Sequence, residues 1–118
     1  MVFDTNIVLD YFKGLTEARK VLEAEHQPAI SAITYAEVLV GVPKERFDEM
    51  KAALRKFTLI PVAQDISEEA AIIRRETRLK LPDAIILATA KVLGKLLVTR
   101  DEKDFGAMEC YVRIPYKV

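Results

Sequence analysis

The sequence predicts an α/β fold in which helices cover both faces of a mostly parallel sheet. Short apolar runs typical of buried strands alternate along the chain with longer runs of helical periodicity, and this alternation favours a parallel sheet. The chain has 118 residues, of which 51% are hydrophobic, so it can build one sizeable core. Because no repeat, low-complexity tract or linker-like stretch divides it, we expect a single domain over residues 1–118.

The expected strands are short, and helical patterns separate them. Apolar runs and β-branched residues predict strands at residues 1–3, 28–31, 58–62, 96–99 and 111–114. The intervening periodic segments predict helices at residues 7–12, 16–25, from about 34, from about 43, at 67–79 and at 82–92.

Two of the expected helices differ in character. The segment PDAIILATAKVL is apolar nearly all round, which indicates a central helix packed on both sides. The helix at 67–79 is amphipathic instead. Its expected inward residues are Ala70, Ala71, Ile72 and Ile73, and its basic face carries Arg74, Arg75, Arg78 and Lys80.

Composition excludes several kinds of chemistry. The 18 basic and 18 acidic residues give zero net charge, so any nucleic acid must be held by a local basic patch. One cysteine, Cys110, and one histidine, His26, argue against a disulfide, a zinc cluster and a Ser-His-Asp triad. Carboxylates and hydroxyls remain as the reactive groups. We also find no signal peptide or membrane span and expect a soluble, cytoplasmic protein.

Four acidic residues stand where expected elements meet. Asp4 closes the first strand, Glu37 follows the second, Asp83 lies just inside the helix that begins at Pro82, and Asp101 follows the apolar strand LLVT. In an open parallel sheet, the carboxyl ends of the strands line one crevice, which is the usual ligand site of such folds. Residues far apart in the sequence can therefore meet in one place.

Each acid also has a purely structural interpretation. Thr34 and Glu37 match a capping box. Asp83 in a first helical turn suits the helix dipole, and Asp4 and Asp101 can each cap a helix. Capping and function are compatible, because a helix N-terminus favours the ionised carboxylate and offsets the repulsion between clustered acids.

Clustered carboxylates without histidine or cysteine favour a hard cation. Mg²⁺ and Mn²⁺ prefer oxygen ligands, and Mg²⁺ keeps waters that a substrate phosphate can displace. Such ions support phosphodiester hydrolysis. A glycosidase that uses paired carboxylates is the alternative chemistry, although its sugar cleft usually contains aromatic residues and this chain has no Trp.

Four motifs in order resemble one family. The stretches MVFDTNIVLDYF, SAITYAEVLVGV, LPDAIILATA and LVTRDEKDF are similar to those of the PIN domain family, specifically the short VapC type of toxin ribonuclease, over essentially the whole chain. The resemblance implies a three-layer α/β/α sandwich with a mostly parallel five-stranded sheet. It also implies an endonuclease that acts on RNA with Mg²⁺ or Mn²⁺, and a homodimer neutralised by a cognate VapB-like antitoxin.

The resemblance also assigns roles to residues. It places the catalytic, metal-binding acids at Asp4, Glu37, Asp83 and Asp101, with Asp101 preferred to Asp104 because it follows the strand more closely. The expected supporting residues are Thr5, Asn6 and Thr99, and the expected RNA contacts are Arg100 and Lys103.

Several questions stay open at the level of sequence. The basic residues Arg74, Arg75 and Arg78 are also candidates for RNA contact, although a solvated surface is their commoner role. Asp10 is expected to be a solvated or helix-end residue. Aromatic residues of the early helices can line a dimer or antitoxin interface, or can pack in the core. These residues are Tyr11, Phe12, Tyr35 and Phe47. The alternative functions are a PIN-like module that binds RNA or protein without cutting, and a DNA nuclease or processing nuclease without an antitoxin.

Overall fold

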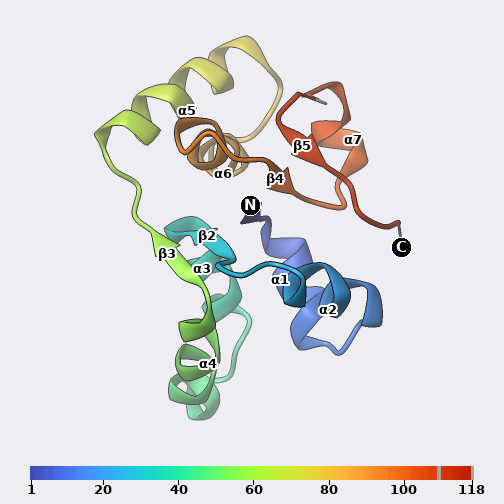
Figure 1. The fold of residues 1–118 in the computed structure, drawn as a ribbon. Helices are drawn as coiled ribbons and strands as arrows, with labels where there is room; N and C mark the ends of the chain where they lie inside the picture. The colour runs from blue at the N-terminus through green and yellow to red at the C-terminus, as the bar shows by residue number, and fades with distance from the viewer. Residues whose placement is uncertain (109, 118) are drawn as a thin grey trace.

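The fold is built around a parallel sheet. The computed structural model describes residues 1–108 and 110–117, and its five strands lie in the order β3-β2-β1-β4-β5 (Figure 1). Every neighbouring pair of these strands is parallel. The strands are β1 (Val2–Phe3), β2 (Ala29–Ser31), β3 (Thr58–Ile60), β4 (Leu97–Val98) and β5 (Val112–Arg113).

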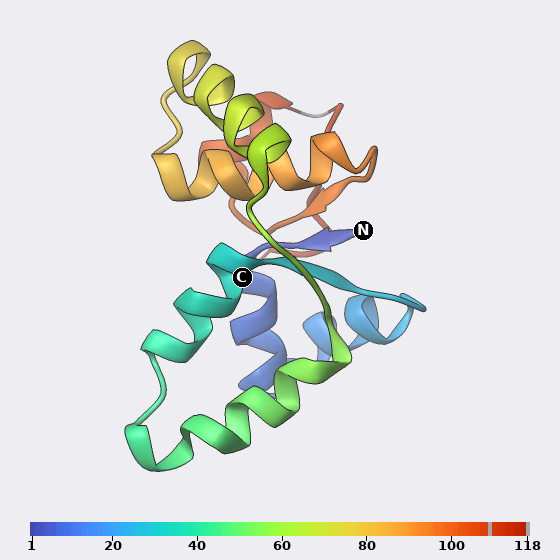
Figure 2. The ribbon, with the colours of Figure 1, turned by 90° about the vertical axis from the view of Figure 1, so that its left-hand side faces the viewer.

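Helices cover both faces of this sheet, which confirms the predicted three-layer sandwich. Figure 2 shows α5 and α6 on one side of the sheet and α1 to α4 on the other. A 3₁₀ turn at Lys44–Arg46 leads into α4, and others follow α4 and α7. The helices are α1 (Thr5–Phe12), α2 (Thr16–Glu23), α3 (Ala32–Val40), α4 (Phe47–Ala53), α5 (Gln64–Glu76), α6 (Leu81–Val92) and α7 (Glu102–Phe105).

Two hydrophobic cores lie on the opposite faces of the sheet. Successive strand residues point to opposite faces, so Val2 belongs to the core beneath α5 and α6 while Phe3 belongs to the core beneath α1 and α3. The same alternation separates Ala29 from Ile30, and Leu97 from Val98. These strands are therefore buried on both faces, as expected for a parallel sheet.

Some boundaries differ from those predicted. The helix expected from about residue 34 begins at Ala32, because the Ser31 side chain at the end of β2 accepts a hydrogen bond from the amide of Ile33 (3.1 Å). Thr34 is therefore buried inside α3, and the predicted capping box is wrong. Pro61 follows β3 and ends it early, since proline lacks the amide that a strand ladder needs.

The predicted amphipathic helix also differs in detail. α5 begins at Gln64 rather than at residue 67, and it ends at Glu76. Ala70 and Ile73 face the core as expected, but Ala71 is exposed and Ile72 is 50% exposed, so their predicted burial is wrong. The four residues of α7 were not predicted. Within the described part of the chain, none of the helices is long and apolar enough to cross a membrane.

Candidate metal site at the carboxyl ends of the strands

The sheet order places three of the strand ends side by side. β1 lies between β2 and β4 at the centre of the sheet. Asp4 follows β1 directly and is the N-cap of α1, while Asp101 follows β4 and is the N-cap of α7. Glu37 lies on α3, which begins directly after β2, and Asp83 lies in the first turn of α6. The four predicted acids are thus carried by elements that start at one edge of the sheet or pack beside it.

Asp4 is a buried carboxylate that accepts two hydrogen bonds. The residue is only 5% exposed. Its Oδ1 accepts from the Thr5 amide (2.7 Å), and its Oδ2 accepts from the Thr99 hydroxyl (2.7 Å). The pKa of Asp4 is raised to about 6, mainly by burial, although both hydrogen bonds act in the opposite direction. The negative charges of Asp83 and Glu37 contribute to this rise. Asp4 therefore shares one electrostatic environment with two other predicted acids.

Thr99 connects the end of β4 to this carboxylate. Its hydroxyl donates to Asp4 and accepts from the side-chain amide of Asn6 (3.2 Å) and from the backbone amide of Asp101 (3.1 Å). The side-chain oxygen Oδ1 of Asn6 in turn accepts from the backbone amide of Arg100 (3.4 Å). Two of the predicted supporting residues, Asn6 and Thr99, thus tie the loop after β4 to the start of α1.

Glu37 is held by the third predicted supporting residue. The Thr5 hydroxyl donates to Glu37 Oε1 (2.6 Å) and lies 3.0 Å from the hydroxyl oxygen of Thr34. The sequence pattern indicates only a capping role for Thr34. Its spacing of three residues from Glu37 was the available signal, because residues three apart share a helix face, and here both face α1.

Asp83 has acidic neighbours on α3, on α7 and at the N-cap of α7. Burial is the main cause that raises the pKa of Asp83, followed by the charges of Glu37, Asp104 and Asp101, while Lys80 lowers it. Asp104 acts on Asp83 more strongly than Asp101 does. Asp101 Oδ1 also accepts from the amide of Asp104 (3.0 Å), so the two candidates for the fourth acid share the first turn of α7.

The donor chemistry suits Mg²⁺ or Mn²⁺. Carboxylate and hydroxyl oxygens are the ligands that these ions prefer. A cation would also relieve the repulsion from neighbouring charges that contributes to the raised pKa values of Asp4 and Asp83. The side chains do not form a closed cage, however. Within the described residues, no group of three or more acidic, histidine or cysteine side chains lies close enough together to hold an ion as it stands. Ion binding would therefore require the carboxylates to draw together.

A second polar cluster lies beside the acids. Asp10 is 5% exposed, so its predicted solvation is wrong. Its carboxylate accepts two hydrogen bonds from Arg100 (2.6 and 3.3 Å) and one from the hydroxyl of Tyr116 (2.9 Å). The sequence signal was that Asp10 is the sole charged residue of α1 and interrupts its apolar stretch after Leu9. Arg100, predicted to contact RNA, is engaged by this partner, whereas Lys103 is exposed on α7.

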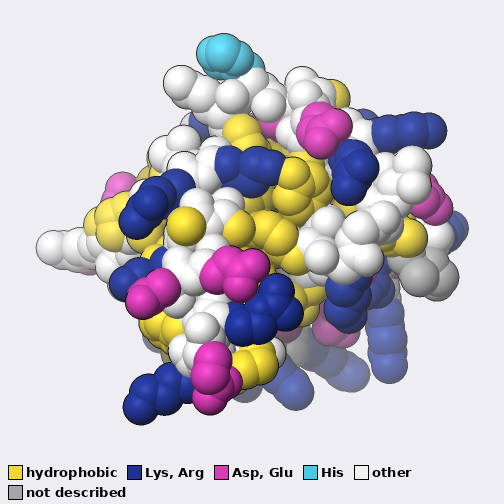
Figure 3. Space-filling view, turned by 90° about the horizontal axis from the view of Figure 1, so that it is seen from below, with side chains coloured by type: hydrophobic (Ala, Val, Ile, Leu, Met, Phe, Trp, Pro, Cys, Tyr) yellow, Lys and Arg dark blue, Asp and Glu magenta, His cyan; other side chains and the backbone are white. Residues whose placement is uncertain are grey.

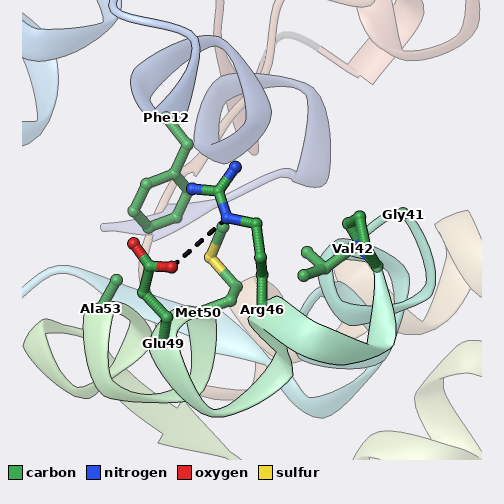
Figure 4. A pocket seen from close by; sticks show the side chains of 8 residues that line it. Phe12, Gly41, Val42, Arg46, Glu49, Met50 and Ala53 are labelled. Carbon is green, nitrogen blue, oxygen red and sulfur yellow. Dashed lines mark hydrogen bonds and ion pairs between the residues drawn. The ribbon is translucent and has the colours of Figure 1, made fainter.

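An apolar groove lies on another face. It has a volume of about 330 Å³ and runs between α1 and α4 at the end of α3, where Phe12, Val42 and Met50 line it together with the Arg46–Glu49 ion pair (3.3 Å; Figure 4). Seen from below, the molecule shows hydrophobic side chains gathered between Lys and Arg side chains (Figure 3). Of the aromatic residues predicted for core or interface, Tyr11, Phe12 and Tyr35 pack on the core, and Phe47 is 39% exposed.

The model of one protein family matches most of the chain. The PIN domain model matches residues 1–109, whereas none of the curated proteins matches the chain. A chain of a toxin-antitoxin complex from Klebsiella pneumoniae is 46% identical, with a TM-score of 0.92 and coverage of 99% of this chain and 98% of that one. FitAcB from Neisseria gonorrhoeae matches at 22% identity, TM-score 0.79 and 99% of each chain. DNA-bound VapBC2 from Rickettsia felis matches at 23% identity and TM-score 0.77, over 91% of this chain and 92% of that one.

Proposed function

The chain belongs to the PIN domain family, and from this premise we propose that it is an endoribonuclease that depends on Mg²⁺ or Mn²⁺ and serves as the toxin of a toxin-antitoxin pair. One observation carries the nuclease proposal: the buried carboxylate of Asp4 lies at the carboxyl end of the sheet within electrostatic range of the half-buried Asp83 and the exposed Glu37. Acids that served only as helix caps would have no reason to share one site, because their mutual repulsion raises the cost of ionisation.

In this proposal, Asp4, Glu37 and Asp83 hold the ion, and Asp101 completes the site or acts through a water. A bound divalent ion supplies a water of lowered pKa and neutralises charge that develops on the phosphate. The chain's own contribution is orientation. Thr99 fixes Asp4 Oδ2 and Thr5 fixes Glu37 Oε1, so each carboxylate keeps lone pairs available while its rotamer is restrained.

The cleavage of labelled single-stranded RNA tests this proposal. Wild-type protein should cut with Mg²⁺ or Mn²⁺ and should not cut with EDTA. Asp4→Asn and Asp83→Asn should each lose more than about 100-fold in rate, since the ion contributes several kcal/mol to the transition state. Asp65→Asn is the matched control, because Asp65 is also an acid of a first helical turn but is exposed on α5. It should cut as fast as the wild type.

The same assay separates the alternatives. If the acids only cap helices, Asp4→Asn and Asp83→Asn would cut like wild type, because Asn caps about as well as Asp. A binding module would retain RNA without cutting it. The assay also distinguishes the two candidates for the fourth acid. We expect Asp101→Asn to lower the rate more than Asp104→Asn, because the Thr99 hydroxyl that donates to Asp4 also accepts from the backbone amide of Asp101 and so holds this residue beside the site.

The proposed antitoxin partner rests on similarity to a chain of a toxin-antitoxin complex over nearly the whole length. The apolar groove beside Phe12 and Met50 is the surface we assign to it. A small neighbouring reading frame whose product stops the cleavage would establish the pair, whereas a processing nuclease would lack one. We also propose a homodimer, on the family resemblance alone, and light scattering on the purified protein tests it.

A further inference from the structure

A groove lined by both apolar and charged side chains opens between two segments that flank the acidic site. Its volume is about 520 Å³, which is within the usual range for ligand sites. One wall is the segment that joins α5 to α6, with Arg78 on it, and the other is α7, with Lys103 and Asp104. The apolar groove described above lies elsewhere and shares no lining residue with this one. We call this second cavity the α5–α7 groove.

The groove lies next to Asp83. Asp104 lines it, and the backbone amide of Asp104 donates to the side chain of Asp101 (3.0 Å), another of the predicted acids. The wall that carries Arg78 also continues through Lys80, the N-cap of α6, into the helical turn that contains Asp83. A strand whose phosphate reached the acids could therefore continue into this groove.

Both walls are fixed by the fold. The Thr77 hydroxyl donates to the carbonyl of Ile73 (2.7 Å) and accepts from the amide of Leu79 (3.1 Å), and Leu79 is buried in the core. On the other wall, the side chain of Asp101 caps α7 and Phe105 is fully buried. The stems of Arg78 and Lys103 thus start from anchored backbone, which lowers the entropy lost when they bind a ligand.

The cations of the groove are available for a ligand. Within residues 1–108 and 110–117, the ion pairs involve neither Arg78 nor Lys103, and both residues are exposed. Arg100 differs, because the buried carboxylate of Asp10 engages it. The residues that line the groove include no aromatic side chain, so the groove lacks a platform on which bases could stack.

We infer that the α5–α7 groove binds the phosphate backbone of the RNA strand next to the cleaved bond, with Arg78 and Lys103 as its phosphate contacts. This inference rests on the proposed nuclease function for the identity of the ligand. Because cations contact phosphates without reading bases, the groove should hold the strand independently of its sequence. Asp104 and Glu76 line it too, and their charges should keep the strand from binding too tightly to leave.

The test measures RNA binding in EDTA, so that cleavage does not interfere. Fluorescence anisotropy of a labelled oligouridylate is recorded over a range of salt concentrations for wild type, Arg78→Ala/Lys103→Ala and the control Arg74→Ala/Arg75→Ala. The control removes two exposed cations of α5 that do not line the groove. Each lost contact to single-stranded RNA lowers the slope of log K against log salt by about 0.7, so the groove variant should lose about 1.4. Arg78→Lys should retain the wild-type slope.

The outcomes separate this inference from the proposed function. A groove variant with the wild-type slope, or one that loses no more than the control, would overturn the inference, as would a wild-type protein that binds no RNA. A wild type that binds with the expected slopes but never cuts would instead count against the nuclease. With Mg²⁺ present, the groove variant should lose kcat/KM on the oligouridylate and keep it on a dinucleotide, which is too short to reach the groove.

Discussion

Burial and hydrogen bonding act in opposite directions on Asp4. The apolar surroundings of β1 disfavour its ionised form, whereas the Thr5 amide and the Thr99 hydroxyl favour it. Both donors require an acceptor, and an ionised carboxylate offers one on each oxygen. Asp4 is therefore kept as a hydrogen-bonded carboxylate whose ionisation is costly, and a bound cation would remove that cost.

This conflict predicts an unusual dependence of stability on pH. The folded-state pKa of about 6 lies above the ordinary value of 3.8, so the folded protein holds the Asp4 proton more tightly than the unfolded chain does. The free energy of unfolding contributed by Asp4 is thus fully present below about pH 4 and is lost as the pH rises through about 6. The loss amounts to about 3 kcal/mol.

Urea unfolding of chelated protein across this range checks the prediction. The free energy of unfolding of Asp4→Asn, minus that of the wild type, should increase by about 3 kcal/mol as the pH rises from about 4 to about 7. The difference between the two proteins removes the contribution of the other titrating groups. A difference that stays constant over the range would show that burial does not raise the pKa of Asp4.

The acids of the site could be predicted from the sequence, but the residues that pair with the polar side chains around it could not. Asp4, Glu37, Asp83 and Asp101 were recognisable because each follows a strand or starts a helix. The burial of Asp10 was not predicted, because its counter-ion comes from Arg100, which is 90 residues away. A helical pattern shows that one charge interrupts an apolar face, but it contains no information about a distant partner.

At the scale of elements, the Asp10–Arg100–Tyr116 cluster joins three parts of the chain. Asp10 lies on α1, Arg100 follows β4, and Tyr116 lies in the segment after β5. The hydrogen bond that Arg100 donates to Asp10 is the main cause that raises the pKa of Arg100. Burial is the main cause that raises the pKa of Tyr116. The cluster thereby holds the loop that carries Thr99 and Asp101 against α1.

Removing the cation of this cluster should destabilise the protein. Arg100→Ala leaves the Asp10 carboxylate buried with the Tyr116 hydroxyl as its remaining partner, and breaking such a pair costs about 3 kcal/mol. Asp10→Asn in the same background should recover part of this loss, since a buried amide costs less than a buried charge. Urea unfolding of the two single variants and the double variant measures the effect. A double variant less stable than Arg100→Ala would contradict this account.

The boundaries of short elements were predicted less well than the elements themselves. The start of α3 was misplaced because Ser31 belongs to a strand and caps a helix at once, and the T-x-x-E pattern three residues later looked equally suitable. α7 has only four residues, which is about one helical turn and too short for periodicity to appear. Ile72 was expected to be buried because it is apolar, yet it lines an open groove beside Met108 and Tyr111 and is 50% exposed.

At the scale of the whole molecule, the strand order explains why the acids share one region. The first strand of the chain lies at the centre of the sheet, with β2 and β4 on its two sides. The chain therefore starts by placing Asp4 in the middle and later adds the elements that carry Glu37, Asp83 and Asp101 around it. Alternation of strands and helices was enough to predict the parallel sheet. The distances between carboxylates depend on packing and were beyond prediction.

Calorimetric titration of Mn²⁺ into the purified protein tests whether these acids form a metal site, and the measurement requires no knowledge of the RNA target. Wild type and the control Asp65→Asn should bind Mn²⁺ with equal affinity and stoichiometry, and Asp4→Asn should lose the binding heat while remaining folded by circular dichroism. A folded Asp4→Asn that binds Mn²⁺ as the wild type does would contradict the account.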